Sequence, residues 1–282
     1  MSRLQAPDWR KLDQAARDRA YNNAAAVAGS AAIVADWDER SAEMRRRHPA
    51  HLDLAYGPRE RNRTDFLKAA DNAPTLVFIH GGYWQMRSKE FFTFCAAGPL
   101  AHGINVALMG YTLAPDATLD EMATEIRAGL DHLQKALPGL GGDPARIIAS
   151  GWSAGGHLVA MTLDHPAVRA GLAISGLYDL EPIRHTYVND KLGLDEATVR
   201  RNSPLLMPGF GAVPLVLVDG DAELPLMRQQ TTDFALYRVQ QGLPVQFEEI
   251  PGADHFTIME QMADPAGRIS LLVRALAAGL AA

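Results

Sequence analysis

The amino-acid sequence predicts an α/β protein with a mostly parallel, doubly wound sheet and helices on both faces. Two observations predict it. Five short, continuous apolar runs each end at a glycine or an Asp-Gly pair, as strands buried on both faces do. Helical patterns separate most of these runs, and strand–helix alternation is typical of parallel crossovers. With 48% hydrophobic and 21% charged residues, the 282-residue chain is typical of a globular protein.

The expected elements follow in chain order. The first 50 residues are polar and helical in pattern, with Ile33, Trp37 and Met44 on one helix face. Buried strands are expected at 75–80, 105–109, 146–150, 171–175 and 214–218, and the alternating segment 244–250 suits an edge strand. Helices are expected at 119–137, 154–163, 226–241 and 269–280.

The segment of about 180–208 breaks this alternation, because it is polar and irregular. Such an insertion in a compact domain is often a lid or a substrate-binding segment. The simplest organisation is a single domain over 1–282, with an N-terminal helical extension over 1–50 and a lid-like insertion.

Composition excludes several classes of function. The net charge of -6 argues against nucleic acid as a partner. No run approaches about 18 apolar residues, so no membrane span is expected. The single cysteine, Cys95, cannot form an intrachain disulfide, and it makes a cysteine-based metal site improbable. The N-terminus lacks the apolar segment of a secretory signal, so a cytoplasmic location is expected.

The third buried run leads into Gly151-Trp-Ser153-Ala-Gly155, a G-x-S-x-G sequence between a strand and a helix. A serine in this sharp, strained turn presents its hydroxyl above the carboxyl edge of the sheet, where ligands bind in such folds. The flanking glycines leave room for the neighbouring backbone. Ser153 is therefore predicted to be a nucleophile, whereas His157, one turn into the helix, is expected to pack in the core.

The first buried run ends in His80-Gly81-Gly82, whose glycines expose backbone N–H groups. Together with the amide of Ala154, these groups can stabilise the oxyanion of an acyl transfer. His80 itself is expected to have a structural, hydrogen-bonding role.

The base and the acid should come after later strands, because triad residues of this fold follow in the order serine, acid, histidine. Of the nine histidines, His255 alone lies beyond the run 214–218, in a loop after the last strand, so it is the predicted general base. Asp219, Asp221 and Glu223 all follow the run 214–218. Spacing does not decide between Asp221 and Glu223 as the acid.

These motifs resemble the α/β-hydrolase superfamily, and within it the kynurenine formamidase (arylformamidase) and hormone-sensitive-lipase-like branch. The resemblance extends over nearly the whole chain. It is carried by these segments: Tyr21-Asn-Asn23, His80-Gly-Gly-Tyr-Trp84, Gly142-Asp-Pro144, Ser153-Ala-Gly-Gly-His157, Ser175-Gly-Leu-Tyr-Asp-Leu-Glu-Pro182, Asn202-Ser-Pro204 and Gly252-Ala-Asp-His-Phe256.

The resemblance implies an α/β-hydrolase fold and favours Glu223 over Asp221 as the acid, because an acid two residues before a proline fits the group's pattern in Glu223-Leu-Pro225. It also implies that Gly81, Gly82 and Ala154 form the oxyanion hole, and that neither a metal nor an organic cofactor is needed.

The expected function is that of a serine hydrolase for small amides or esters, with an arylformamidase acting on N-formylkynurenine-like amides favoured. A carboxylesterase or a hydrolase of carbamates or other amides is the alternative, and a non-catalytic ligand receptor is a remote one. Tyr83 and Trp84 are expected at the mouth of the site, where they could stack on an aryl substrate; the alternative is that they pack within the loop. The expected partner is the small-molecule substrate, without nucleic acid or membrane, and a homodimer is possible.

Overall fold

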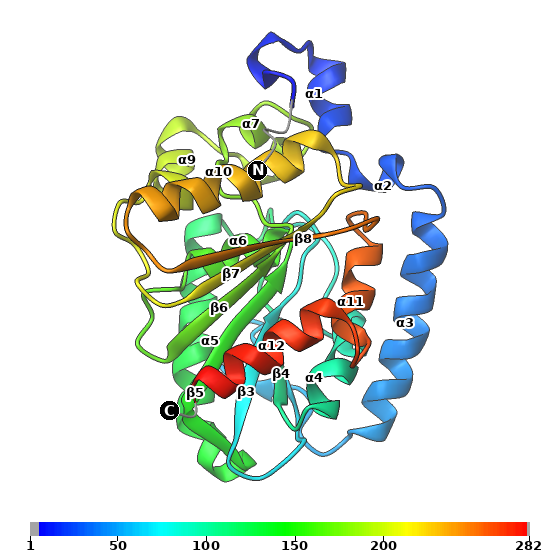
Figure 1. Ribbon diagram of the computed structural model, residues 1–282, viewed down its shortest axis with the longest axis vertical. Helices are drawn as coiled ribbons and strands as arrows, with labels where there is room; N and C mark the ends of the chain where they lie inside the picture. The colour runs from blue at the N-terminus through cyan, green and yellow to red at the C-terminus, as the bar shows by residue number, and fades with distance from the viewer. Residues whose placement is uncertain (1–5, 281–282) are drawn as a thin grey trace.

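The computed structural model describes residues 6–280, and one eight-stranded sheet runs through them (Figure 1). The strand order is β1-β2-β4-β3-β5-β6-β7-β8. The strands are β1 (Leu54–Ala55), β2 (Arg63–Leu67), β3 (Ala73–Ile79), β4 (Asn105–Met109), β5 (Gly142–Trp152), β6 (Val168–Ile174), β7 (Leu215–Gly220) and β8 (Val245–Ile250). From β4 to β8 all neighbours are parallel, whereas β1 and β2 add an antiparallel edge.

The predicted fold class is confirmed, and each strand expected from the sequence is present. The strands β1 and β2 were not expected. Arg63-Thr-Asp-Phe-Leu67 carries charged residues near the start of the strand, so it lacks the continuous apolar signal of the other strands.

Helices cover both faces of the sheet because successive strand residues point to opposite faces. One face packs against α5 (Leu119–Leu140), α6 (Ala154–Ala160) and α10 (Pro225–Gln240). The other face packs against α3 (Ser30–Arg47), α4 (Ala97–Ala101), α11 (Glu260–Ala263) and α12 (Arg268–Gly279). Trp37 of α3 is fully buried there, while Ile33 and Met44 pack against the same core, as their spacing predicts. No helix within residues 6–280 combines the length and apolarity of a membrane span.

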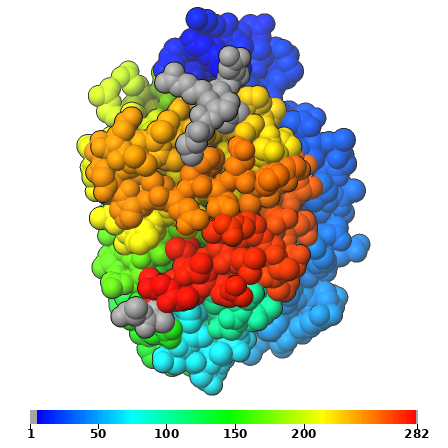
Figure 2. Space-filling view, viewed as in Figure 1, coloured from blue at the N-terminus to red at the C-terminus, as the bar shows by residue number. Residues whose placement is uncertain are grey.

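The N-terminal helices and the insertion after β6 contact each other at one end of the molecule (Figures 1 and 2). The N-terminal part comprises η1 (Trp9–Lys11), α1 (Gln14–Ala20) and α2 (Asn23–Ala26), and the insertion comprises α7 (Glu181–Arg184), α8 (Asn189–Leu192), α9 (Glu196–Asn202) and η3 (Pro204–Leu206). Gln14 donates a hydrogen bond to the His185 carbonyl at 3.0 Å, and the Tyr187 N–H donates one to Asp18 at 2.8 Å. Trp9 also stacks on the His185 ring.

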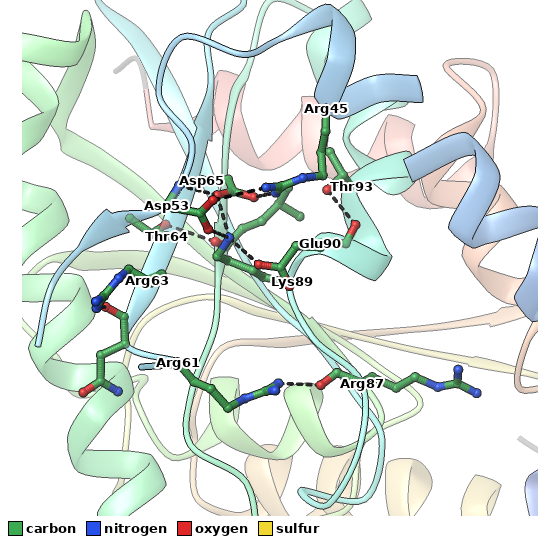
Figure 3. Close-up of polar contacts among 12 residues, drawn as sticks. Arg45, Asp53, Arg61, Arg63, Thr64, Asp65, Arg87, Lys89, Glu90 and Thr93 are labelled. Carbon is green, nitrogen blue, oxygen red and sulfur yellow. Dashed lines mark hydrogen bonds and ion pairs between the residues drawn. The ribbon is translucent and has the colours of Figure 1, made fainter. Parts of the chain in front are cut away.

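A partly buried ion cluster fixes the loop that leaves β3 (Figure 3). Lys89, just before η2 (Glu90–Ala96), places its ammonium 2.6 Å from Asp53, 2.7 Å from Asp65 and 2.6 Å from Glu90. Asp65 is fully buried on β2 and also pairs with Arg45 of α3. The three carboxylates are close enough to ligate a metal ion, but the Lys89 ammonium already neutralises part of their charge. The cluster therefore ties α3, β2 and the β3 loop together.

Candidate active site

The turn between β5 and α6 holds Ser153 in a strained conformation. Its φ is 56°, which is uncommon for a residue with a side chain. A Cβ on Gly155 would lie 2.0 Å from the Ile79 carbonyl oxygen, and one on Gly151 would lie 2.5 Å from the Gly155 backbone. Only glycine fits at these two positions, which explains the G-x-S-x-G spacing.

Three side chains from separate strand ends form a continuous hydrogen-bonded chain. His255, in the loop after β8, has its Nε2 3.1 Å from the Ser153 Oγ. Its Nδ1 lies 2.7 Å from Oε2 of Glu223, which follows β7. The three residues are 2%, 3% and 6% exposed for Ser153, His255 and Glu223, so the contacts lie in a largely water-free environment. A carboxylate that contacts an imidazole, which in turn contacts a hydroxyl, can activate that hydroxyl as a nucleophile.

The contacts of the carboxylates that follow β7 distinguish which of them faces His255, a question that residue spacing left open. Glu223 contacts His255, whereas exposed Asp221 accepts a hydrogen bond from the Gly252 N–H at 2.6 Å and closes a turn. Asp219 is buried at the end of β7, and its two carboxyl oxygens have no hydrogen-bond partner within residues 6–280. Burial, and next the nearby Glu223, raise the pKa of Asp219 to about 8.

The glycines after β3 lie directly against the serine turn. A Cβ on Gly81 would lie 2.6 Å from the Trp152 ring and 3.1 Å from the Ser153 Cβ. Gly82 has a φ of 115°, and a Cβ there would lie 2.3 Å from the Met86 carbonyl oxygen. Glycine is thus required for this close backbone approach. Ala154 follows Ser153 and begins α6, so the backbones of two segments lie close together beside Ser153.

His80 is buried beneath this loop and orients it. Burial lowers the pKa of His80 to about 3, so the ring is neutral. Its Nδ1 lies 2.8 Å from the Gly81 carbonyl oxygen and therefore carries the proton that is donated there. The Tyr111 hydroxyl donates to the His80 carbonyl at 3.0 Å. The structural role expected for His80 agrees with these contacts.

The two aromatic residues after the glycines have different positions. Tyr83 is half-buried, and its hydroxyl donates to the Tyr21 carbonyl at 2.6 Å and accepts from Asn23 at 3.3 Å. Trp84 has no exposed surface, and its indole N–H donates to His157 Nδ1 at 3.3 Å. The expectation that Trp84 lies at the mouth of the site is therefore wrong. Its large apolar ring instead packs in the core behind the loop, where the indole N–H has a hydrogen-bond acceptor.

His157 is a core residue, as its position in α6 predicts. Its Nε2 lies 2.7 Å from the Asn202 carbonyl oxygen and carries the ring proton, so Nδ1 accepts from Trp84. Burial lowers the pKa of His157 to about 4, which keeps it neutral.

Ser175 is a site residue to which the sequence analysis gave no role. It follows β6, and its hydroxyl donates to Oε1 of Glu223 at 2.6 Å. The available signal was its position: it ends a buried strand and precedes a glycine, as strand-end site residues in such sheets do.

Known proteins share both sequence and structure with this chain. The BD-FAE family model matches residues 66–166. A kynurenine formamidase of Danio rerio is 30% identical over 76% of this chain and 77% of its own length, and one of Salmo salar is 33% identical with the same coverage. A solved protein from Silicibacter sp. TM1040, described as a thioesterase, is 28% identical with a TM-score of 0.83, covering 91% of this chain and 98% of its own.

More distant solved structures show the fold alone. The carboxylesterase EstE1, cloned from a metagenomic library, has a TM-score of 0.69 at 21% identity, with 87% of this chain and 94% of that chain covered. Together with the identities to the two fish formamidases over three quarters of the sequence, these similarities show that the chain belongs to the kynurenine formamidase family of α/β-hydrolases.

Proposed function

We propose that the protein is a serine hydrolase that cleaves a small amide, with an N-formyl arylamine of the N-formylkynurenine type as the favoured substrate class. The observation that carries this proposal is the chain of contacts Ser153–His255–Glu223, at 3.1 and 2.7 Å. The substrate class rests on the relatives that are kynurenine formamidases.

In the proposed reaction, His255 takes the Ser153 proton as the serine oxygen bonds to the substrate carbonyl carbon. The oxyanion that forms accepts hydrogen bonds from the backbone N–H groups of Gly81, Gly82 and Ala154. Glu223 orients the imidazole and stabilises the imidazolium. The imidazolium then protonates the leaving amine as the carbon–nitrogen bond breaks, and the acyl group stays on Ser153.

The second half of the reaction reverses these roles. His255 removes a proton from water, whose oxygen attacks the acyl-enzyme, and the Ser153 oxygen leaves with a proton returned from the imidazolium. The products are the amine and the carboxylic acid. We further propose that Tyr83, held by its hydroxyl to the N-terminal segment, offers its ring face to the aryl group of the substrate.

Carboxylesterase or thioesterase activity is the second candidate, since a 28% identical relative is described as a thioesterase. The same residues would act, with an alcohol or thiol as the leaving group. Rates on N-formylkynurenine and on p-nitrophenyl acetate, measured with one preparation, separate the amide hydrolase from the carboxylesterase. A kcat/KM for the formamide well below that for the ester would reassign the protein as an esterase.

The mechanism is tested with Ser153→Ala and a matched control, Ser150→Ala. Ser150 lies on β5, the strand that precedes Ser153; it is fully buried, and its hydroxyl has no hydrogen-bond partner within residues 6–280. We expect Ser153→Ala to lose hydrolysis of both substrates and labelling by a fluorophosphonate probe, while Ser150→Ala keeps both. Full activity in Ser153→Ala would overturn the proposed mechanism. Wild-type protein that neither hydrolyses nor labels would instead indicate a ligand receptor.

A further inference from the structure

The hydrogen-bonded chain of the site continues past Glu223. Of the two carboxylate oxygens of Glu223, Oε2 faces His255, while Oε1 accepts from the Ser175 hydroxyl at 2.6 Å and from the Gly220 N–H at 2.9 Å. A carboxylate only accepts hydrogen bonds, so Ser175 is the donor. The series of hydrogen-bonded side chains thus begins at Ser153 and ends at Ser175.

The two serines share an unusual backbone conformation. Ser153 directly follows β5 with a φ of 56°, and Ser175 directly follows the neighbouring strand β6 with a φ of 51°. A non-glycine residue in this region costs free energy, and such residues concentrate at functional sites. The Ser175 N–H donates to the Val218 carbonyl at 2.7 Å, which fixes the backbone so that the hydroxyl meets Glu223.

The environment of Glu223 makes this hydroxyl important. Ser175 is 1% exposed, so water has little access to replace its donated bond. The titratable groups that interact electrostatically with Glu223 come from four segments: Tyr83 after β3, Tyr178 after β6, Asp219 at the end of β7 and His255 after β8. The cation Arg228 of α10 acts on Asp219 and is itself paired with Glu249 at 2.5 Å.

We propose that Ser175 is a positioning residue for the reaction, whose hydroxyl holds the Glu223 carboxylate aimed at His255. This inference rests on the proposed function. Without the hydroxyl, Oε1 would keep the Gly220 N–H alone, and the carboxylate would be free to turn away from the imidazole. Ser175 acts through Glu223 and does not touch the substrate.

The test uses Ser175→Ala and Ser175→Gly with p-nitrophenyl acetate and N-formylkynurenine. Both variants remove the hydroxyl, but glycine also relaxes the positive φ. We expect kcat to fall roughly tenfold in both variants, as for loss of a hydrogen bond to a charged group, with KM unchanged. If Ser175→Ala does not fold, the measurements on Ser175→Gly test the proposal.

The pH profile distinguishes positioning from a merely structural role. Without the Ser175 hydroxyl, a carboxylate that turns away from the imidazole stabilises the imidazolium less, so the site loses its proton more readily. The acid limb of the kcat/KM profile should therefore move to lower pH. Ser150→Ala should leave both the limb and kcat unchanged. In a Glu223→Gln background, removing the Ser175 hydroxyl should cause no further loss.

Two results would overturn the inference: an unchanged kcat and acid limb in both variants, or a lower kcat that accompanies lost thermal stability with an unmoved limb. Failure of the proposed function looks different, because Ser153→Ala would then remain active. An inactive Ser153→Ala together with unaffected Ser175 variants would remove only the positioning role.

Discussion

The Trp152 indole lies 4.8 Å from the His255 imidazole, and its N–H donates to the backbone carbonyl of the same histidine at 2.9 Å. One side chain thus holds both the backbone and the ring of His255. Since the proposed reaction charges the imidazole, we expect the nearby indole ring to stabilise the imidazolium, by about 0.5–2 kcal/mol.

Replacing Trp152 should therefore lower activity in two steps. Trp152→Phe keeps a ring near the imidazole but loses the N–H, and we expect kcat to fall several-fold. Trp152→Leu loses both contributions and should be roughly tenfold slower again, since about 1.4 kcal/mol corresponds to a factor of ten. Steady-state rates on p-nitrophenyl acetate measure both effects. Equal rates for the two variants would show that the ring contributes nothing.

Glu223→Gln should be strongly impaired and Asp221→Asn should not. Removing the charge beside a triad histidine lowers kcat by roughly 10⁴-fold in a well-studied protease. Here Glu223 contacts His255 at 2.7 Å, whereas the Asp221 carboxylate accepts a hydrogen bond from the Gly252 N–H. Single-turnover rates with both variants, at matched thermal stability, decide the assignment. Loss of activity in Asp221→Asn instead would reverse it.

Gly81→Ala should inactivate the protein by displacing the backbone next to Ser153. Its added Cβ would lie 2.6 Å from the Trp152 ring, so the loop must shift. Loss of one oxyanion donor lowers kcat by about 100- to 1000-fold. Gly139→Ala in α5 is the matched control, because nothing lies within 4 Å of its added Cβ. We expect that variant to keep wild-type kcat, and a comparable loss there would contradict the explanation.

Lys89→Met should destabilise the fold. Lys89 is 3% exposed and Asp65 is fully buried, so removing the cation leaves the Asp65 carboxylate with Arg45 as its remaining ion-pair partner among the described residues. Removing one partner of a buried ion pair costs up to about 3–5 kcal/mol of unfolding free energy. Lys68→Met removes an exposed pair with Asp71 and should cost less than about 1 kcal/mol. Urea unfolding of both variants tests this difference in stability. Equal unfolding midpoints for the two variants would refute it.

Asp219→Asn should change how stability depends on pH. Because burial and Glu223 raise the pKa of Asp219 to about 8, the folded state keeps its proton at pH values where the unfolded chain has lost it. This contribution is full below about pH 4 and falls as the pH rises to about 8. Relative to wild type, the variant should therefore gain thermal stability across this window. A difference in Tm that does not vary with pH would show that Asp219 ionises normally.

The strand pattern was sufficient to predict most of the sheet and the approach of Ser153 to His255, because strand-end residues of a parallel sheet meet at one edge. It did not reveal β2, because the burial of Asp65 depends on Arg45 and Lys89, which are distant in sequence. The position expected for Trp84 was wrong for a similar reason. Whether a loop aromatic faces the solvent or the core depends on a partner, here His157, that arises only in the folded chain.

Residue spacing left the acid open and the family resemblance favoured Glu223, whereas the contact of Ser175 with Glu223 follows only from the folded structure. Asp221 and Glu223 differ by two residues in one turn, and their directions follow from the backbone of that turn rather than from residue type. The Ser175 hydroxyl meets Glu223 only because β6 and β7 are neighbours in register.

Each site residue follows a different strand, and this arrangement affects how fast the site forms during folding. Ser153 and His255 are 102 positions apart, and their contact requires β5, β6, β7 and β8 to be aligned side by side. Such non-local pairings form slowly, because chain entropy must be lost before the contacts compensate for it. During refolding, secondary structure should therefore return before hydrolytic competence. Recovery of hydrolysis should thus report the alignment of β5 to β8, and a fragment that ends before β8 should not regain it.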